Sequence, residues 1–322
     1  MDPRTIRALR AKLTHWYDRA KRNLPWRRTR DPYAIWISEV MLQQTRVAAV
    51  IPYYERFLRR FPNPVALAEA PEPELLALWS GLGYYSRARN LRKAARQIVE
   101  RGGFPRDYAS LLELAGVGAY TAAAIASISF GLPHAAVDGN VRRVLARLLN
   151  DGHADAQTIA GCLLDRRDPA RWNQAVMELG ATICLPREPR CGKCPVAAHC
   201  AARLAGTEKD LPLKKAAAAP ERHARTLLVI HRRGRILLMP SRRVTGFWDL
   251  PEPFAHVKTG APLGEFTHTI THRRYRFTVR EGSGLSLSNG APKSARWKTR
   301  KQLAEIPLST VARKALRIYN AL

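Results

Sequence analysis

The chain has 322 residues, enough for two domains that each bury a core. Its 54 Lys and Arg residues against 26 Asp and Glu residues leave a formal charge of +28, which predicts a polyanionic partner. Nucleic acid is the first candidate, ahead of an anionic membrane and of a merely solvated basic surface. No leader peptide or membrane-spanning apolar run is present, so we expect a cytoplasmic, nucleoid-associated monomer without a membrane partner.

Apolar residues recur at three and four positions up to about residue 204, which predicts an all-α N-terminal part. Within it, Asp31-Pro32 and Asn63-Pro64 each have the pattern of a helix N-cap followed by proline in the first turn. Residues 205–223 lack periodicity and are rich in charge, alanine and proline, which is typical of a linker.

The hydrophobic period changes to two after residue 224. Residues 225–240 predict two strands around a turn at Arg233-Gly234, and residues 265–281 alternate in the same manner. A helical pattern over residues 309–322 closes the chain. We therefore expect a small α+β domain over residues 224–322, attached to the helical part.

A lone carboxylate, Glu39, lies among apolar residues in "AIWISEVMLQQT". If this segment is buried, its setting raises the pKa of Glu39 toward that of a useful acid, although a place on the polar face beside Gln43 is the alternative. Asp138, in "AAVDGNVRRVLARLL", precedes a periodic run and suits an N-cap. Two such carboxylates also match the needs of acid-assisted cleavage of a glycosidic bond.

A glycine-rich break, Gly116-Val117-Gly118, interrupts helical sequence in "LLELAGVGAYTAAAIASISFG". Glycine allows close approach of another backbone, and a helix that restarts there offers free N–H groups to a phosphate oxygen. A helix-turn-helix corner without a ligand explains the pattern equally well.

Four of the five cysteines, Cys184, Cys191, Cys194 and Cys200, occur within 17 residues of one another. Their spacing favours a [4Fe–4S] cluster, with structural zinc as the competitor. Arg187, Arg190 and Lys193 on the same loop would form a phosphate-contacting surface if a metal holds it rigid. The fifth cysteine, Cys162, is expected in the core.

Taken together, the glycine turn, the "VDGNV" aspartate and the four cysteines resemble the endonuclease III superfamily of helix-hairpin-helix DNA glycosylases. The segments "LPWR", "WISEVMLQQTRV", "GLGYYSRARN" and "GVGAYTA" resemble, within it, the adenine DNA glycosylases of the MutY family. The similarity is strong over about residues 15–200 and weak beyond them.

The resemblance implies a multi-domain protein with an all-α helix-hairpin-helix glycosylase core, a [4Fe–4S] cluster loop and a small α+β Nudix-like C-terminal domain. Its parts would be a helical glycosylase domain over residues 1–204, a linker over 205–223 and the Nudix-like domain over 224–322. Within the first, residues 25–130 would form a six-helix barrel with the hairpin at 111–130, while 1–24 and 131–204 would form the cluster domain with its loop at 184–200.

The implied activity is excision of adenine mispaired with 8-oxoguanine or G in double-stranded DNA, after the adenine is flipped out of the duplex. Glu39 would protonate adenine, Asp138 would stabilise the positive sugar, Asn140 would position Glu39 and the water, and Tyr120 would line the sugar pocket. The residues implied to contact DNA are Gln44 and Tyr84 in the base stack, Gly116, Val117 and Gly118 at a phosphate, and Arg22, Arg27 and Glu178 around the adenine.

Tyr120 bears on the class of reaction, because endonuclease III has at the corresponding site a lysine whose amine forms a Schiff base. A phenol cannot form that imine, so we expect a monofunctional glycosylase. The alternatives are a bifunctional glycosylase and lyase acting on oxidised pyrimidines, a non-enzymatic Fe–S nucleic-acid-binding protein, and a zinc-stabilised DNA-binding protein.

The C-terminal part resembles the Nudix-like module with which this family recognises 8-oxoguanine. The segment "GFWDLPE", Gly246 to Glu252, fits that module, but no Nudix catalytic helix follows it, so nucleotide hydrolysis is not expected. In "HTITH", Thr271 and His272 align with the family's 8-oxoguanine-recognition loop, while Ile270 replaces its usual aromatic residue. An ordinary alternating strand is the other interpretation of this stretch.

Overall fold

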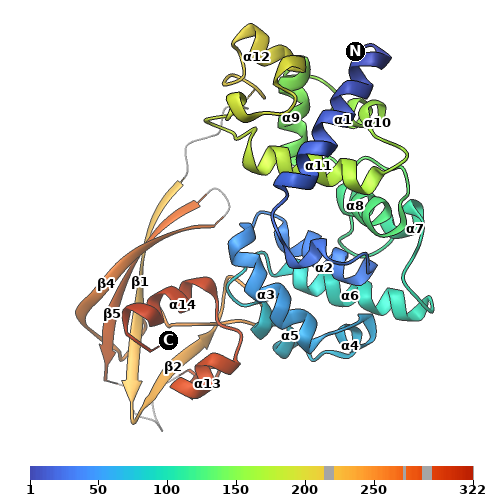
Figure 1. Ribbon diagram of the computed structural model, residues 1–322. Helices are drawn as coiled ribbons and strands as arrows, with labels where there is room; N and C mark the ends of the chain where they lie inside the picture. The colour runs from blue at the N-terminus through green and yellow to red at the C-terminus, as the bar shows by residue number, and fades with distance from the viewer. Residues whose placement is uncertain (214–220, 271–272, 285–291, 322) are drawn as a thin grey trace. The chain divides into compact units, whose positions relative to one another are not determined.

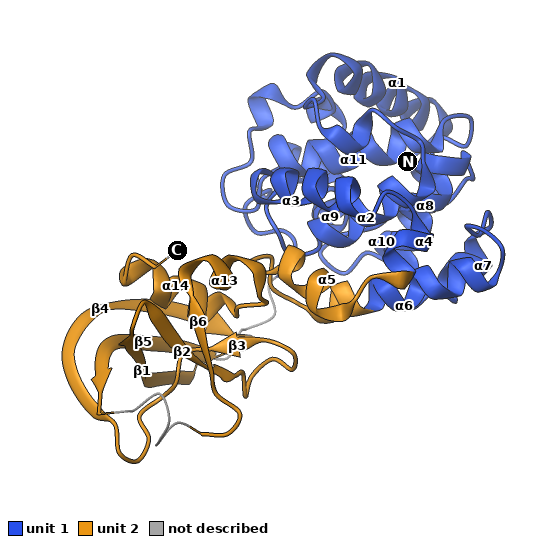
Figure 2. Cartoon of the chain, turned by 90° about the horizontal axis from the view of Figure 1, so that it is seen from below, with its two compact units in different colours: residues 1–68, 90–217 blue, residues 69–89, 218–322 orange. Residues whose placement is uncertain are grey.

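The computed structural model describes residues 1–213, 221–270, 273–284 and 292–321. It divides into two compact units, one of residues 1–68 and 90–217 and the other of residues 69–89 and 218–322 (Figure 2). The second grouping differs from the predicted domains, which left residues 69–89 in the helical part. The reason is that Ser80 and Tyr85 in this segment contact Leu308 and Phe247 of the C-terminal part.

The first 205 residues are helical, as the periodicity predicts (Figure 1). Asp31 accepts hydrogen bonds from the first-turn amides of its helix, and Asn63 Oδ1 accepts one from Ala66 N, so both predicted N-caps are confirmed. The helices are α1 (Pro3–Ala20), α2 (Pro32–Leu42), α3 (Val47–Arg60), α4 (Pro64–Glu69), α5 (Glu72–Trp79), α6 (Ser86–Glu100), α7 (Tyr108–Leu112), α8 (Ala119–Phe130), α9 (Gly139–Leu149), α10 (Ala156–Leu163), α11 (Pro169–Thr182) and α12 (Ala201–Ala205).

Two helices of the first unit, α2 and α8, are buried around most of their circumference and pack against each other. This explains why their sequences are apolar almost throughout, since a helix enclosed by others has no solvent face. A separate core joins α1 to α9, α10 and α11 and extends to three of the clustered cysteines. Cys162, predicted to lie in the core, is exposed, because α10 buries Ala160 and Leu163 instead.

The C-terminal unit contains a mixed sheet in the order β3-β2-β1-β5-β4, with β6 paired to β2. Its elements are β1 (Glu221–Arg232), β2 (Arg235–Pro240), β3 (Trp248–Asp249), β4 (Lys258–Ile270), β5 (Arg273–Ser283), β6 (Arg296–Thr299), α13 (Arg300–Glu305) and α14 (Thr310–Ile318). Strands β1 and β5 are parallel and the other paired strands antiparallel. Helix α14 contributes to the core of the unit.

The predicted hairpin at Arg233-Gly234 is confirmed, and both turn residues have positive φ, as a tight two-residue turn between twisted strands requires. Strand β1 starts at Glu221, inside the predicted linker. The other end of that linker is attached to α9, where Leu211 O accepts a hydrogen bond of 3.0 Å from Arg147 Nε. Thr271 and His272 lie outside the described residues. Within the described ranges, no helix combines the length and apolar character needed to cross a bilayer.

Candidate active site

Glu39 lies in the buried helix α2 with 6% of its surface exposed, so the prediction of an apolar setting is confirmed and the polar-face alternative is wrong. Burial raises the pKa of Glu39 to about 7, with the nearby charge of Asp138 adding to the rise. The Tyr120 hydroxyl donates to Glu39 Oε2 at 2.6 Å and opposes part of that rise. A carboxyl group with this pKa keeps a large share of its protons near neutral pH and can act as an acid.

The glycine turn connects α7 to α8 and explains how Tyr120 reaches Glu39. Gly116 has φ of +76°, and a Cβ atom there would lie 2.7 Å from Asn90 Cβ, so only glycine fits. Val117 is buried, and Gly118 forms the N-cap of α8 without a side-chain hydrogen bond, which leaves the first-turn N–H groups free of a side-chain cap. Tyr120 then follows in the first turn of the buried helix.

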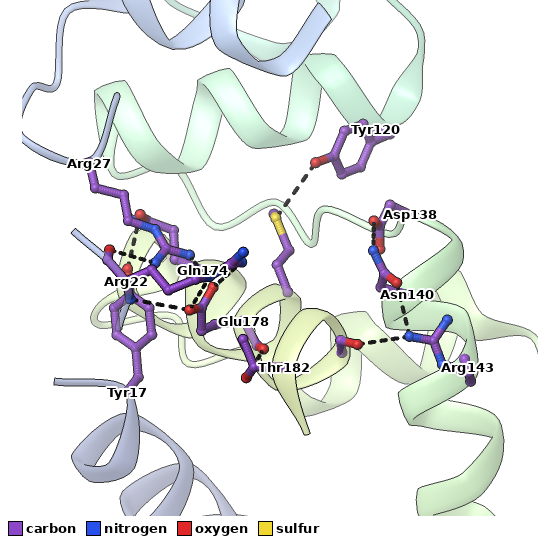
Figure 3. Close-up of polar contacts among 12 residues, drawn as sticks. Tyr17, Arg22, Arg27, Tyr120, Asp138, Asn140, Arg143, Gln174, Glu178 and Thr182 are labelled. Atoms are coloured by element: carbon purple, nitrogen blue, oxygen red, sulfur yellow. Dashed lines mark hydrogen bonds and ion pairs between the residues drawn. The ribbon is translucent and has the colours of Figure 1, made fainter. Parts of the chain in front are cut away.

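Asp138 forms the N-cap of α9, as predicted, and its Oδ1 accepts a hydrogen bond of 2.7 Å from Val141 N. Its other oxygen accepts from Asn140 Nδ2 at 2.9 Å. The hydrogen bonds shown for Asn140 are this one to Asp138 and one that its Oδ1 accepts from Arg143 at 2.9 Å (Figure 3). Asn140 therefore orients Asp138, while its predicted role toward Glu39 and the water stays a prediction.

Arg143 connects this aspartate to the first cysteine of the cluster loop. Its side chain is 7% exposed and donates to Asn140 Oδ1, to Gly180 O and to Cys184 O, each at 2.9 Å. The three acceptors come from α9, from α11 and from the start of the cysteine loop. One buried guanidinium thus links three separate segments.

The variant Arg143→Met is expected to lower the free energy of unfolding by about 3 kcal/mol, because it leaves two buried carbonyl oxygens and one amide oxygen without a charged donor. Chemical denaturation of the purified variant measures this value. The neighbouring variant Arg142→Met is the matched control, because Arg142 is exposed. Equal stability of the two variants would contradict a linking role for Arg143.

The predicted adenine-pocket residues form one ion-pair group. Arg22 Nε and Nη2 donate to the two oxygens of the fully buried Glu178 at 2.8 and 2.7 Å, and Arg27 Nη2 donates to Oε2 at 2.6 Å (Figure 3). Burial opposes ionisation of Glu178, but these two arginines hold its pKa down at about 2. Glu178 is therefore an anion with fixed partners, in contrast to the protonatable Glu39.

A cavity of about 840 Å³ brings most of these groups together. Its lining includes the predicted site residues Glu39, Tyr120, Asp138, Asn140, Arg22, Arg27, Glu178, Gln44 and Gly118. Gln44 lies two residues after the end of α2 and is exposed. Its φ is +55°, a conformation that few residues other than glycine adopt. Tyr84 belongs to the other unit, and Gly116 and Val117 do not line the cavity.

The four clustered cysteines line a second cavity, of about 30 Å³. Burial raises the pKa of Cys194 to about 11, with the neighbouring thiol groups adding to the rise, so thiolates here need a compensating positive charge. Among the described residues, no three Cys, His, Asp or Glu side chains are spaced to hold one metal ion. Four thiol sulfurs around one cavity are a donor set that suits an iron–sulfur cluster and also a single zinc ion.

The sequence pattern did not identify three residues that support the site and the cysteine loop: Arg143, Arg147 and Gly180. Arg147 is 1% exposed and donates to Cys184 Sγ at 3.3 Å and to Leu185 O at 2.7 Å. A Cβ atom on Gly180 would lie 2.8 Å from Asn140 Cβ, so glycine lets α11 approach the first turn of α9. The pattern did contain a clue, because the two arginines stand four residues apart among the apolar residues of one helix.

Comparison with known proteins supports the family assignment. Residues 37–160 match the HhH-GPD superfamily base excision DNA repair proteins. The adenine DNA glycosylase of Homo sapiens is 34% identical over 99% of this chain and 75% of its own length, and that of Mycolicibacterium smegmatis is 42% identical over 61% of this chain and 69% of its own length. A solved thermostable thymine-DNA glycosylase is 29% identical, with a TM-score of 0.59 over 63% of this chain and 98% of its own. The chain belongs to the adenine DNA glycosylase family of base-excision DNA repair enzymes.

Proposed function

We propose that this enzyme hydrolyses the bond between adenine and deoxyribose in double-stranded DNA, where the adenine is mispaired with 8-oxoguanine or G. The observation that carries the proposal is the convergence of a protonatable Glu39, its partner Tyr120 and the carboxyl group of Asp138 on one cavity. The formal charge of +28 suits a DNA substrate, and the cavity is large enough for a base flipped out of the duplex.

In the proposed reaction, Glu39 transfers its proton to N7 of the flipped adenine, and the glycosidic bond breaks with its electron pair moving to the base. Tyr120 donates to one oxygen of Glu39, which leaves the other oxygen free to hold that proton. Asp138 stabilises the positive charge that develops on the sugar. Water then attacks the anomeric carbon and returns a proton to Glu39.

The expected product is an intact strand with an abasic site. Tyr120 stands where a lyase needs an amine, and among the described residues that line this cavity none is a lysine. Without an amine near the sugar, no Schiff base forms and the strand is not cut. This supports a monofunctional glycosylase over the bifunctional alternative.

Several groups would contact the DNA. The free first turn of α8, next to Gly118, is suited to a phosphate oxygen. Gln44 and Tyr84, both exposed with positive φ, would enter the base stack, and Arg22, Arg27 and Glu178 would border the flipped adenine. We assign 8-oxoguanine recognition to the C-terminal unit as a Nudix-like module, with Thr271 and His272 as the candidate contacts.

We further propose that Cys184, Cys191, Cys194 and Cys200 hold one [4Fe–4S] cluster. When bound, it would hold the loop of Arg187, Arg190 and Lys193 rigid, and these three side chains are exposed as a phosphate-contacting surface requires. The purified protein is expected to show a broad visible absorption band and about four iron atoms per chain. A Cys194→Ser variant should lose both, whereas a colourless protein containing zinc would support the competing assignment.

The activity itself is tested with duplexes containing adenine opposite 8-oxoguanine, adenine opposite G, or thymine glycol, each with and without alkali. Cleavage at adenine that requires alkali is the expected result, because alkali breaks the strand at an abasic site. Strand breaks at thymine glycol without alkali would instead support the bifunctional alternative.

The rate of excision is expected to fall as the pH rises through about 7. Glu39 must be protonated to act as an acid, and above its pKa the protonated fraction declines by about tenfold per pH unit. Single-turnover excision across the neutral and alkaline range measures this profile. A rate that stays constant there would show that Glu39 is not the proton donor.

A further inference from the structure

Tyr84 is an exposed aromatic residue held in a disfavoured backbone conformation. Its φ is +47° and 52% of its surface is exposed, and Gly81 and Gly83 just before it have φ of +108° and +73°. An aromatic residue adopts this conformation only where its surroundings impose it. The contacts that impose it therefore decide where the ring points.

The first set of contacts comes from the segment itself. Arg87 is 8% exposed and donates to Gly83 O at 3.2 Å, and its guanidinium lies 5.5 Å from the centre of the Tyr84 ring. Trp79 Nε1 donates to the same carbonyl oxygen at 3.1 Å. The peptide groups before Tyr84 are thus tied to the end of α5 and the start of α6.

The second set comes from the C-terminal part of the same unit. Ser80 Oγ donates to Leu308 O at 2.6 Å and accepts from Arg313 Nε at 2.8 Å. On the other side of the loop, the Tyr85 ring lies 3.9 Å from the ring of Phe247, and its hydroxyl lies 3.1 Å from Thr310 Oγ1. The residues on both sides of the loop are therefore anchored to Phe247, just before β3, and to the start of α14.

The "GFWDLPE" segment builds this anchor. Phe247 supplies the ring under Tyr85, and a Cβ atom on Gly246 would lie 3.2 Å from Leu76 Cδ1, so glycine allows this close approach to α5. Asp249 accepts a hydrogen bond from Ser309, the N-cap of α14, and pairs with Arg243 at 3.3 Å. The segment that resembles part of a Nudix core thus fixes the helix that holds Ser80.

We propose that residues 221–321 of the C-terminal unit position Tyr84, in the 69–89 segment of the same unit, for entry into the DNA base stack. Arg313, Ser80 and Tyr85 are the positioning residues. The inference rests on the proposed function, in which Tyr84 enters the stack. It gives the C-terminal unit a second role besides contact with the opposing base, because loss of these contacts would change base unstacking without touching DNA. Arg313 is the residue that tests it, since its Nε donates to Ser80 Oγ just before the loop and it lies on α14, outside residues 69–89.

The test is a double-mutant cycle between Arg313→Met and Tyr84→Ala, made in full-length protein that also has Glu39→Gln so that the substrate persists. The probe is a duplex with adenine opposite 8-oxoguanine and 2-aminopurine beside the mispair, whose fluorescence rises when it unstacks. Each single variant is expected to weaken the unstacking equilibrium by about tenfold, because Tyr84→Ala removes the ring that enters the stack and Arg313→Met removes one hydrogen bond with a charged donor. The double variant should lose no more than Tyr84→Ala alone.

Arg317→Met is the matched control, because Arg317 is exposed on the same helix, and it should behave as the parent does. Thermal unfolding identifies a misfolded variant, in which case Ser80→Ala replaces Arg313→Met in the cycle. Additive losses, or no loss from Arg313→Met, would overturn the inference. If the unmodified protein excises adenine but the losses in the cycle are additive, only this inference fails. If the unmodified protein excises no adenine, the proposed function fails, and the cycle still reports whether Arg313 acts through Tyr84.

Discussion

Replacing Glu39 by glutamine is expected to lower the rate of adenine excision by about a thousandfold, because the amide cannot supply the proton that makes adenine a leaving group. The measurement is a single-turnover assay on a duplex with adenine opposite 8-oxoguanine. Binding should be retained, since glutamine has nearly the same shape and can still accept the hydrogen bond from Tyr120.

The same substitution is expected to stabilise the protein at alkaline pH. Burial raises the pKa of Glu39 from 4.5 to about 7, so the folded state binds the proton more tightly than the unfolded state. The associated stability is complete below pH 4.5 and is lost as the pH rises through about 7, by on the order of 3 kcal/mol. Glu39→Gln lacks this loss, and urea unfolding of the two proteins at about pH 4.5 and at alkaline pH measures the difference. If Glu39→Gln excised adenine at the normal rate, Glu39 would not be the proton donor.

The variant Asp138→Asn is expected to lower the rate of excision by about a thousandfold while leaving duplex affinity and helix α9 intact. Asparagine is as good an N-cap as aspartate, so its oxygen can still accept from Val141 N. It lacks the negative charge that stabilises the developing positive sugar, which is the catalytic contribution proposed for Asp138. Single-turnover rates and equilibrium binding to the same duplex separate the two effects.

Asp155→Asn is the matched control for this change, because Asp155 is the exposed N-cap of α10 and accepts a hydrogen bond from Gln157 N. It should excise adenine at the normal rate. If Asp138→Asn instead lost affinity for the duplex together with stability, Asp138 would be a structural cap and the charge argument would be wrong.

Much of the site was predictable from local pattern. Asp31 and Asp138 were identified as N-caps because capping depends only on neighbouring backbone amides. Glu39 was identified because an isolated carboxylate among apolar residues has few settings other than a buried one. Tyr120 required the family resemblance, since a lone aromatic residue at a helix start is as well explained by packing.

Other features depended on which segments meet in space. Local propensity and spacing were enough to predict the helical part, the part with a hydrophobic period of two, the hairpin at Arg233-Gly234 and the grouping of the cysteines. The three-dimensional fold alone reveals that Arg143 bonds Gly180 and Cys184, and that Cys162 is exposed. It likewise decided that residues 69–89 join the C-terminal unit, since the contacts that hold them come from residues more than 150 positions away in the chain.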